Sequence, residues 1–123
     1  MTKTKERKPI AKADRSAETL TAILDAIDAI DTAKVVLADA QGGQRADLKT
    51  YNEEVDVAVA QARGSEDDDP TTKLVKIIDR WDALLKARAD WGEKVKAARD
   101  EVKARETALA ELRAAARQPG LFD

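Results

Sequence analysis

The sequence contains no cysteine and no histidine, and only four of its 123 residues are aromatic. Without cysteine there is no disulfide, no thiolate nucleophile and no cysteine zinc site. Without histidine, the usual general base near neutral pH and the commonest metal ligand are both missing. With 37% of residues charged, the chain also lacks the apolar material for a thick globular core. We therefore expect a protein that is not an enzyme and that holds no metal and no cofactor.

Other features typical of catalytic or metal sites are missing too. The two serines, Ser16 and Ser65, fall at an expected helix start and an expected turn, and no glycine-rich phosphate loop is present. The acidic run Glu66–Asp69 lacks the spaced ligands of a calcium loop. Negative charge just before a helix has a structural explanation, because it interacts favourably with the helix N-terminus.

Helix-forming residues dominate the composition. Alanine, leucine, glutamate, lysine and arginine together supply 65 of the 123 residues, as is typical of long helices. No stretch shows the alternation of a half-buried strand, and no apolar run is long enough for a signal peptide or a membrane span. We expect an all-α, soluble and cytoplasmic protein that does not bind membranes.

A repeat of 3.5 residues runs through the second half of the chain. It comprises Leu74, Ile77, Trp81, Leu84, Arg88, Trp91, Val95, Ala98, Val102, Arg105, Leu109, Leu112 and Ala116. Such a repeat places a narrow apolar stripe, here called the seam, on one side of a helix, and burying the seam requires a second helix.

A matching seam runs through the first half. It comprises Leu20, Ile23, Ile27, Ile30, Lys34, Leu37, Gln41, Gln44, Leu48, Tyr51, Val55, Ala58 and Ala62. Its register carries across Gly42 and Gly43, although glycine is unfavourable in a helix interior. This continuity predicts one helix with a soft point at 42–43, or two collinear helices.

The two seams predict a long antiparallel helical hairpin, a coiled coil. Asp69 fits the N-cap of the second helix and Pro70 its first turn. The expected parts are a flexible basic arm at 1–15, a helix at 16–62, a turn at 63–70, a helix at 71–117 and a tail peptide at 118–123.

Antiparallel pairing of the seams predicts which residues face each other. Gln41 is expected to face Trp91, and Gln44 to face Arg88, which gives a polar layer in the seam. The neighbouring glycines leave room for an indole, so we interpret the layer as a device that fixes register. The alternative is a recess for a ligand. Arg105 is expected to reach Asp28 or Asp31 across the hairpin.

Further apolar residues lie just beside the seam. Near the turn they are Val59, Val75, Ile78 and Leu85. A widened apolar stripe is typical of a helix that contacts more than one neighbour. We therefore predict that these residues mediate self-association, with two hairpins forming a homodimer in a four-helix arrangement.

The basic N-terminal arm carries Lys3, Lys5, Arg7 and Lys8. Such residues can contact phosphates, but the arm has no aromatic side chains for stacking on bases. Weak or absent nucleic-acid contact is expected, since short basic termini are common on solvated proteins.

The C-terminal tail is the one part with a specific motif. Gln118, Leu121 and Phe122 form a Gln-x-x-Leu-Phe pattern, which resembles the peptide by which bacterial replication and repair proteins bind the DNA polymerase sliding clamp. The resemblance implies that the glutamine amide is bound and that the Leu-Phe pair fills an apolar pocket. Pro119 and Gly120 stand where that family usually has leucine and serine or aspartate. The alternative is that Leu121 and Phe122 fold back over the end of the hairpin.

These observations predict a non-enzymatic helical adaptor that presents its C-terminal peptide to a protein partner. The sliding clamp is the partner that the resemblance implies, in a replication or recombination accessory of phage or mobile-element type. The alternative is a structural or assembly coiled coil, of scaffolding or chaperone-like type, that does not bind the clamp.

Overall fold

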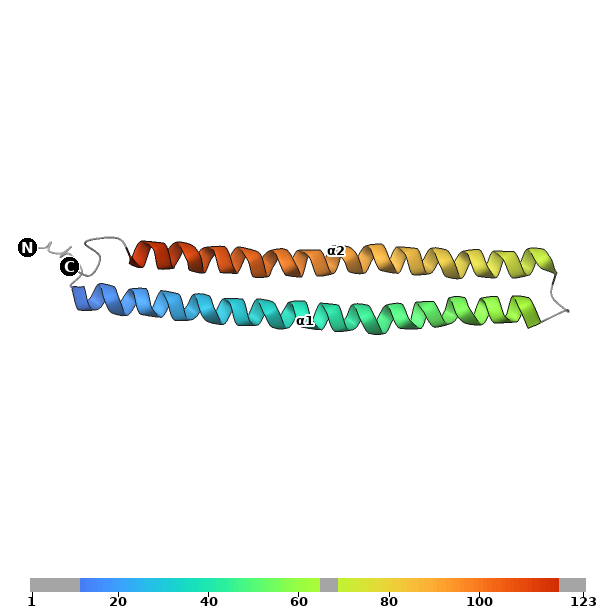
Figure 1. The fold of residues 1–123 in the computed structure, drawn as a ribbon, viewed down its shortest axis with the longest axis horizontal. Helices are drawn as coiled ribbons and strands as arrows, with labels where there is room; N and C mark the ends of the chain where they lie inside the picture. The colour runs from blue at the N-terminus through green and yellow to red at the C-terminus, as the bar shows by residue number, and fades with distance from the viewer. Residues whose placement is uncertain (1–11, 65–68, 118–123) are drawn as a thin grey trace, which may run out of the picture. The chain divides into compact units, whose positions relative to one another are not determined.

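A computed structural model describes residues 12–64 and 69–117. They form two helices, α1 (Lys12–Gly64) and α2 (Pro70–Ala116), and the described residues include no strand. The helices pack against each other as a helical hairpin (Figure 1). The predicted all-α hairpin is therefore confirmed.

The start of α2 follows the chemistry of its first residues. Pro70 opens the helix, where a missing backbone N–H costs nothing. The carbonyl oxygen of Asp69 accepts a hydrogen bond from the amide of Lys73 at 3.1 Å. The hydroxyl of Thr72 reaches back to the Asp69 carboxylate at 3.5 Å. Asp69 therefore stands at the N-cap, as its position before a proline suggests.

Helix α1 is longer than the repeat alone suggests. It begins at Lys12 rather than at the expected Ser16, and it ends at Gly64. It also continues through Gly42 and Gly43. Favourable packing along a helix can outweigh the low propensity of glycine, which amounts to about 1 kcal/mol per residue.

The chain forms two compact units, each built from parts of both helices. Within the described chain, unit 1 contains residues 12–34 and 101–117, and unit 2 contains residues 35–64 and 69–100. In each unit the α1 and α2 segments lie side by side and run in opposite directions (Figure 1). Each unit therefore buries one side of each of its helices.

The buried side of α1 in unit 1 agrees with the expected seam at Ile30 and differs from it at Ile27 and Lys34. Ile30 and Ala33 are buried, whereas Leu20 is 57% and Ile27 is 41% exposed. Lys34, which the repeat placed in the seam, is exposed. Because neighbouring helical residues point about 100° apart, replacing Lys34 by Ala33 in the seam turns Leu20 and Ile27 outward.

Unit 2 shows the same preference for alanine on α2. Leu84 is completely buried, and Ala87 and Ala98 are 7% and 8% exposed. Arg88, expected in the seam, is exposed beside the buried Ala87. Alanine loses no rotamer freedom on burial, whereas burying an unpaired guanidinium is costly. The small residue therefore takes the contact position.

A heptad of alanines could have indicated the correct register of α1. Ala26, Ala33 and Ala40 are seven residues apart, and all three are buried or half-buried. The interaxial distance between packed helices depends on the side chains at the contact, so small residues allow a closer approach. The expected seam was chosen by hydrophobicity alone, so it placed Ile27 rather than Ala26 at the contact with α2.

Ion pairs on the surface of α2 connect residues one turn apart. Lys86 binds Asp90 and Lys96 binds Asp100, both at 2.9 Å. The hydrogen bond to the carboxylate raises the pKa of each lysine above its usual 10.5. A raised folded-state pKa contributes stability below pH 10.5, and this contribution is lost as the pH rises through the raised value. The pairs are exposed, so they mainly support the local helix.

Arg105 also pairs within its own helix. Its Nε lies 2.6 Å from Oε2 of Glu101, and its side chain is about half exposed. The sequence-based expectation that it reaches Asp28 or Asp31 is therefore replaced by a contact one turn away. A partner on the same helix is easier to reach, because no second helix has to supply it.

The corrected register makes a direct prediction for unit 1. Ile30→Ala should lower the free energy of unfolding by about 2–4 kcal/mol, because it removes a buried side chain and leaves a cavity. Ile27→Ala is the matched control and should cost less than half as much, since Ile27 is already 41% exposed. Urea denaturation followed by circular dichroism measures both. Equal losses would contradict the observed register.

Candidate functional site

The most specific contact between the helices of unit 2 is made by Trp91. Its indole Nε1 donates a hydrogen bond to Oδ2 of Asp47 at 2.7 Å. A half-buried indole N–H needs such a partner, and the negative charge of the acceptor strengthens the bond. The amine of Lys94 lies 4.6 Å from the centre of the ring, in cation–π geometry.

Gly43 provides the space for this indole. A Cβ atom at position 43 would lie 2.8 Å from Cη2 and 3.3 Å from Cζ3 of Trp91, which is too close for an undisturbed side chain. At Gly42 and Gly92 a Cβ atom would meet nothing within 4 Å. Of these three glycines, only Gly43 is therefore required for the fit of Trp91.

The expected polar layer is only partly assembled. Gln41, Gln44 and Trp91 are half-buried, whereas Arg88 is exposed. Within the described chain, none of Gln41, Gln44 and Arg88 forms a hydrogen bond with Trp91, whose partner is Asp47. Sequence analysis missed Asp47, although it lies four residues after Gly43 and therefore on the same side of α1.

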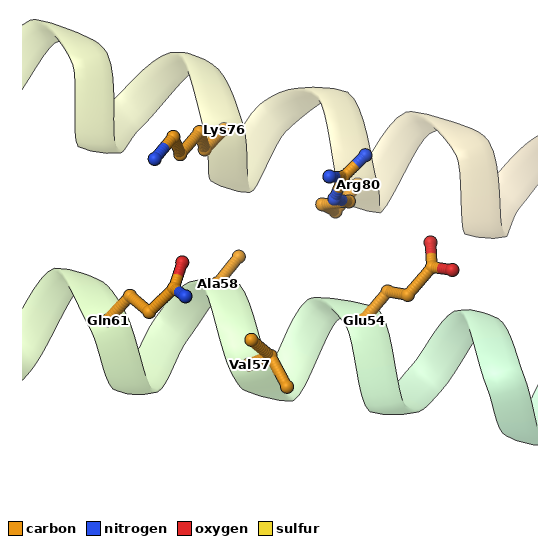
Figure 2. A pocket seen from close by; sticks show the side chains of 6 residues that line it. All are labelled: Glu54, Val57, Ala58, Gln61, Lys76 and Arg80. Carbon is orange, nitrogen blue, oxygen red and sulfur yellow. The ribbon is translucent and has the colours of Figure 1, made fainter.

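An open groove of about 260 Å³ lies between the helices of unit 2. Figure 2 shows the side chains that line it, Glu54, Val57, Ala58 and Gln61 from α1 and Lys76 and Arg80 from α2. Pockets for small molecules are usually larger, about 300–1,000 Å³, and mostly apolar. The mixed charges and the small volume do not indicate a small-molecule site.

Other types of site find little support in the described residues. A second hollow, in unit 1, is lined by residues of α1 alone, from Ala17 to Asp25. Across 12–64 and 69–117, no group of three acidic residues is placed to hold a metal ion. Neither α1 nor α2, as far as they are described, has the length and apolarity needed to cross a membrane.

The most prominent surface of unit 2 is apolar and lies on α2. Leu74, Ile78, Trp81 and Leu85, here called the lateral stripe, are 45–57% exposed, and Val75 beside them is 48% exposed. Their spacing of four, three and four residues keeps them within about 60° of one another on a helix. The centre of the stripe lies about 90° around α2 from the buried Leu84 and about 150° from the buried Ala87.

The lateral stripe and the groove lie on opposite flanks of the helix pair. Lys76, which lines the groove, projects from α2 on the far side of its buried face from Ile78, and Arg80, seven residues before the buried Ala87, lies beside that face. On α1, Val57 lines the groove, and Val59 lies on the other side of the buried Ala58. Val59 therefore lies on the flank of the lateral stripe, where it is half-buried.

The four residues predicted to mediate self-association lie on this flank. Val75, Ile78 and Leu85 are exposed, and Val59 is half-buried. Leu74 and Trp81 were not predicted as members of this surface, because the 3.5-residue repeat places both in the seam. Their distance of three and four residues from Ile78 and Leu85 could have indicated a second repeat on α2.

The remaining candidate residues lie outside the described chain. They are the basic residues Lys3, Lys5, Arg7 and Lys8 and the tail residues Gln118, Leu121 and Phe122. Both sets therefore stay predictions from the sequence.

Substitution of the two adjacent glycines should separate the packing of Trp91 from helix propensity. Gly42→Ala should raise the free energy of unfolding by about 0.5–1 kcal/mol, the usual gain of alanine over glycine in a helix. Gly43→Ala should leave the free energy of unfolding unchanged or lower it, because its Cβ would lie 2.8 Å from the indole of Trp91. Urea denaturation of both variants measures the difference. An equal gain at both positions would show that the indole does not constrain Gly43.

Comparison of the chain with protein-family models, with curated proteins and with solved structures found no match. A functional assignment therefore depends on the surfaces described above and on the tail motif.

Proposed function

We propose that the protein is a non-enzymatic helical adaptor that presents its C-terminal peptide to a protein partner, with the bacterial sliding clamp as that partner. The observation that carries the proposal is the Gln-x-x-Leu-Phe pattern formed by Gln118, Leu121 and Phe122. Helix α2 ends at Ala116, two residues before Gln118. The motif thus directly follows the hairpin in the sequence.

The chemistry of the motif suits recognition by a pocket. Two adjacent apolar side chains, Leu121 and Phe122, can anchor a peptide, and the amide of Gln118 can fix its register. Pro119 limits the conformations of the chain between them. The clamp assignment itself comes from the resemblance of these residues to clamp-binding peptides.

A replication or recombination accessory of phage or mobile-element type would use such an adaptor in the cytoplasm. The absence of histidine and cysteine supports a non-catalytic role. The basic residues near the N-terminus add at most a weak phosphate contact.

The second candidate function is assembly, and the lateral stripe is the observation that favours it. In this function the hairpin is a structural coiled coil, scaffolding or chaperone-like, that associates with a second copy in a four-helix arrangement. Contiguous exposed apolar surface often marks a protein interface. The tail would then cover an end of the hairpin instead of binding the clamp.

The apolar surface of the lateral stripe supplies a free energy comparable in size to the cost of association. Leu74, Val75, Ile78, Trp81 and Leu85 each keep about half of their surface exposed. Burying the rest gains about 1 kcal/mol per side chain, hence on the order of 10 kcal/mol for two copies. Association costs about 4–15 kcal/mol, so the apolar surface alone offsets most of this cost.

A binding experiment with purified bacterial sliding clamp tests the adaptor function. Leu121→Ala combined with Phe122→Ala should weaken binding by about 100-fold or more, because hot-spot side chains each contribute about 2 kcal/mol or more. The matched control changes another adjacent apolar pair, Val35 and Val36, which are exposed on α1. Surface plasmon resonance gives the dissociation constants. If the unmodified protein does not bind the clamp, the adaptor proposal is rejected.

Light scattering tests self-association independently of the tail. Ile78→Asp combined with Leu85→Asp should convert a dimer into monomers, because both carboxylates would be placed in the apolar interface. The control is Ala97→Asp combined with Ala104→Asp, a pair with the same seven-residue spacing at exposed positions of α2. The control should remain dimeric with equal helicity. A mass that is the same in both variants would remove the lateral stripe as the interface.

A further inference from the structure

The lateral stripe is arranged so that it matches itself when reversed. The steps from Leu74 to Ile78 to Trp81 to Leu85 are four, three and four residues, which read the same in either direction. The midpoint falls between Asp79 and Arg80. A second copy of α2 running antiparallel therefore brings Leu85 of the second copy opposite Leu74.

The same arrangement combines residues of different size in the central layers. Ile78 of one copy faces Trp81 of the second copy, and the reverse pair follows by symmetry. In a parallel dimer, the two Trp81 side chains would meet in one layer and the two Ile78 side chains in another. Large residues pack better against smaller ones, because facing layers then interdigitate.

The area involved is sufficient for a dimer that dissociates. Five half-exposed apolar residues in two copies supply roughly 600 Å² of apolar surface. Apolar atoms make up about 60% of a typical interface, so the total comes to roughly 1,000 Å². This value is near the lower limit for a specific interface. It suits a reversible dimer rather than an obligate one.

We infer that the occupant of the lateral stripe is the same stripe of a second copy, in an antiparallel dimer whose two-fold axis crosses the stripe between Ile78 and Trp81. The inference depends on the self-association proposed above and adds its orientation and its residue pairs. The groove lined by Lys76 and Arg80 lies on the opposite flank and stays outside this interface.

Disulfide crosslinking of the full-length chain tests the orientation. The protein has no cysteine, so an introduced cysteine is the only thiol of its chain. The variants Leu74→Cys and Leu85→Cys are mixed in equal amounts, at a concentration at which light scattering shows dimers, and are oxidised mildly. Trypsin places positions 74 and 85 in different peptides, so mass spectrometry distinguishes a mixed disulfide from the two symmetric ones.

The mixed disulfide should exceed either symmetric one by about fivefold or more, because a disulfide requires Cα atoms within about 7 Å. In the antiparallel dimer, equivalent positions of the two chains are about 16 Å apart along the helix. Ala97→Cys, an exposed position away from the stripe, measures random collisions. The antiparallel pairing is contradicted if symmetric disulfides are in excess, or if a sample that is dimeric by mass forms no mixed disulfide. Neither result contradicts self-association itself. A monomeric mass for the unmodified protein would instead reject self-association itself.

Discussion

The burial of small residues between α1 and α2 is the constraint on which the rest of the structure depends. Ala33, Ala87 and Ala98 occupy buried positions, and Gly43 accepts the indole of Trp91. A helix can bury only one face against a single neighbour. When alanines take that face, larger apolar side chains such as Leu20 and Leu85 are turned outward. The surfaces available to partners are thus a consequence of how the hairpin closes.

The sequence was sufficient to predict two long helices, because a 3.5-residue repeat and the Asp69–Pro70 boundary are local signals. The side that each helix buries was predicted only in part: Val55, Leu84 and Val95 are buried as expected, whereas Leu20 and Ile27 are exposed. Positions such as Ala26 and Ile27 compete for the same contact, and hydrophobicity alone favours the larger residue. The spacing of the helices decides in favour of the smaller one, and this spacing is a tertiary property.

The site around Trp91 was likewise predictable from the sequence only in part. An indole beside glycine was predictable, since the antiparallel pairing places Trp91 opposite the Gly42–Gly43 pair. The structure then shows that Gly43 is the one of the two that makes room for it. Its hydrogen-bond partner was not, because Asp47 and Gln44 lie on neighbouring parts of one helix turn. Which of them reaches the Nε1 atom depends on a shift of one or two residues between helices. The choice of Asp47 satisfies the N–H with a charged acceptor.

The two tryptophans occupy environments that differ in polarity. Trp91 is half-buried, bonded to Asp47 and covered by Lys94, whereas Trp81 is 46% exposed on the lateral stripe. An indole emits at shorter wavelength when it leaves water. Opening of the hairpin would therefore shift the emission of Trp91 to longer wavelength, whereas covering of the lateral stripe would shift the emission of Trp81 to shorter wavelength.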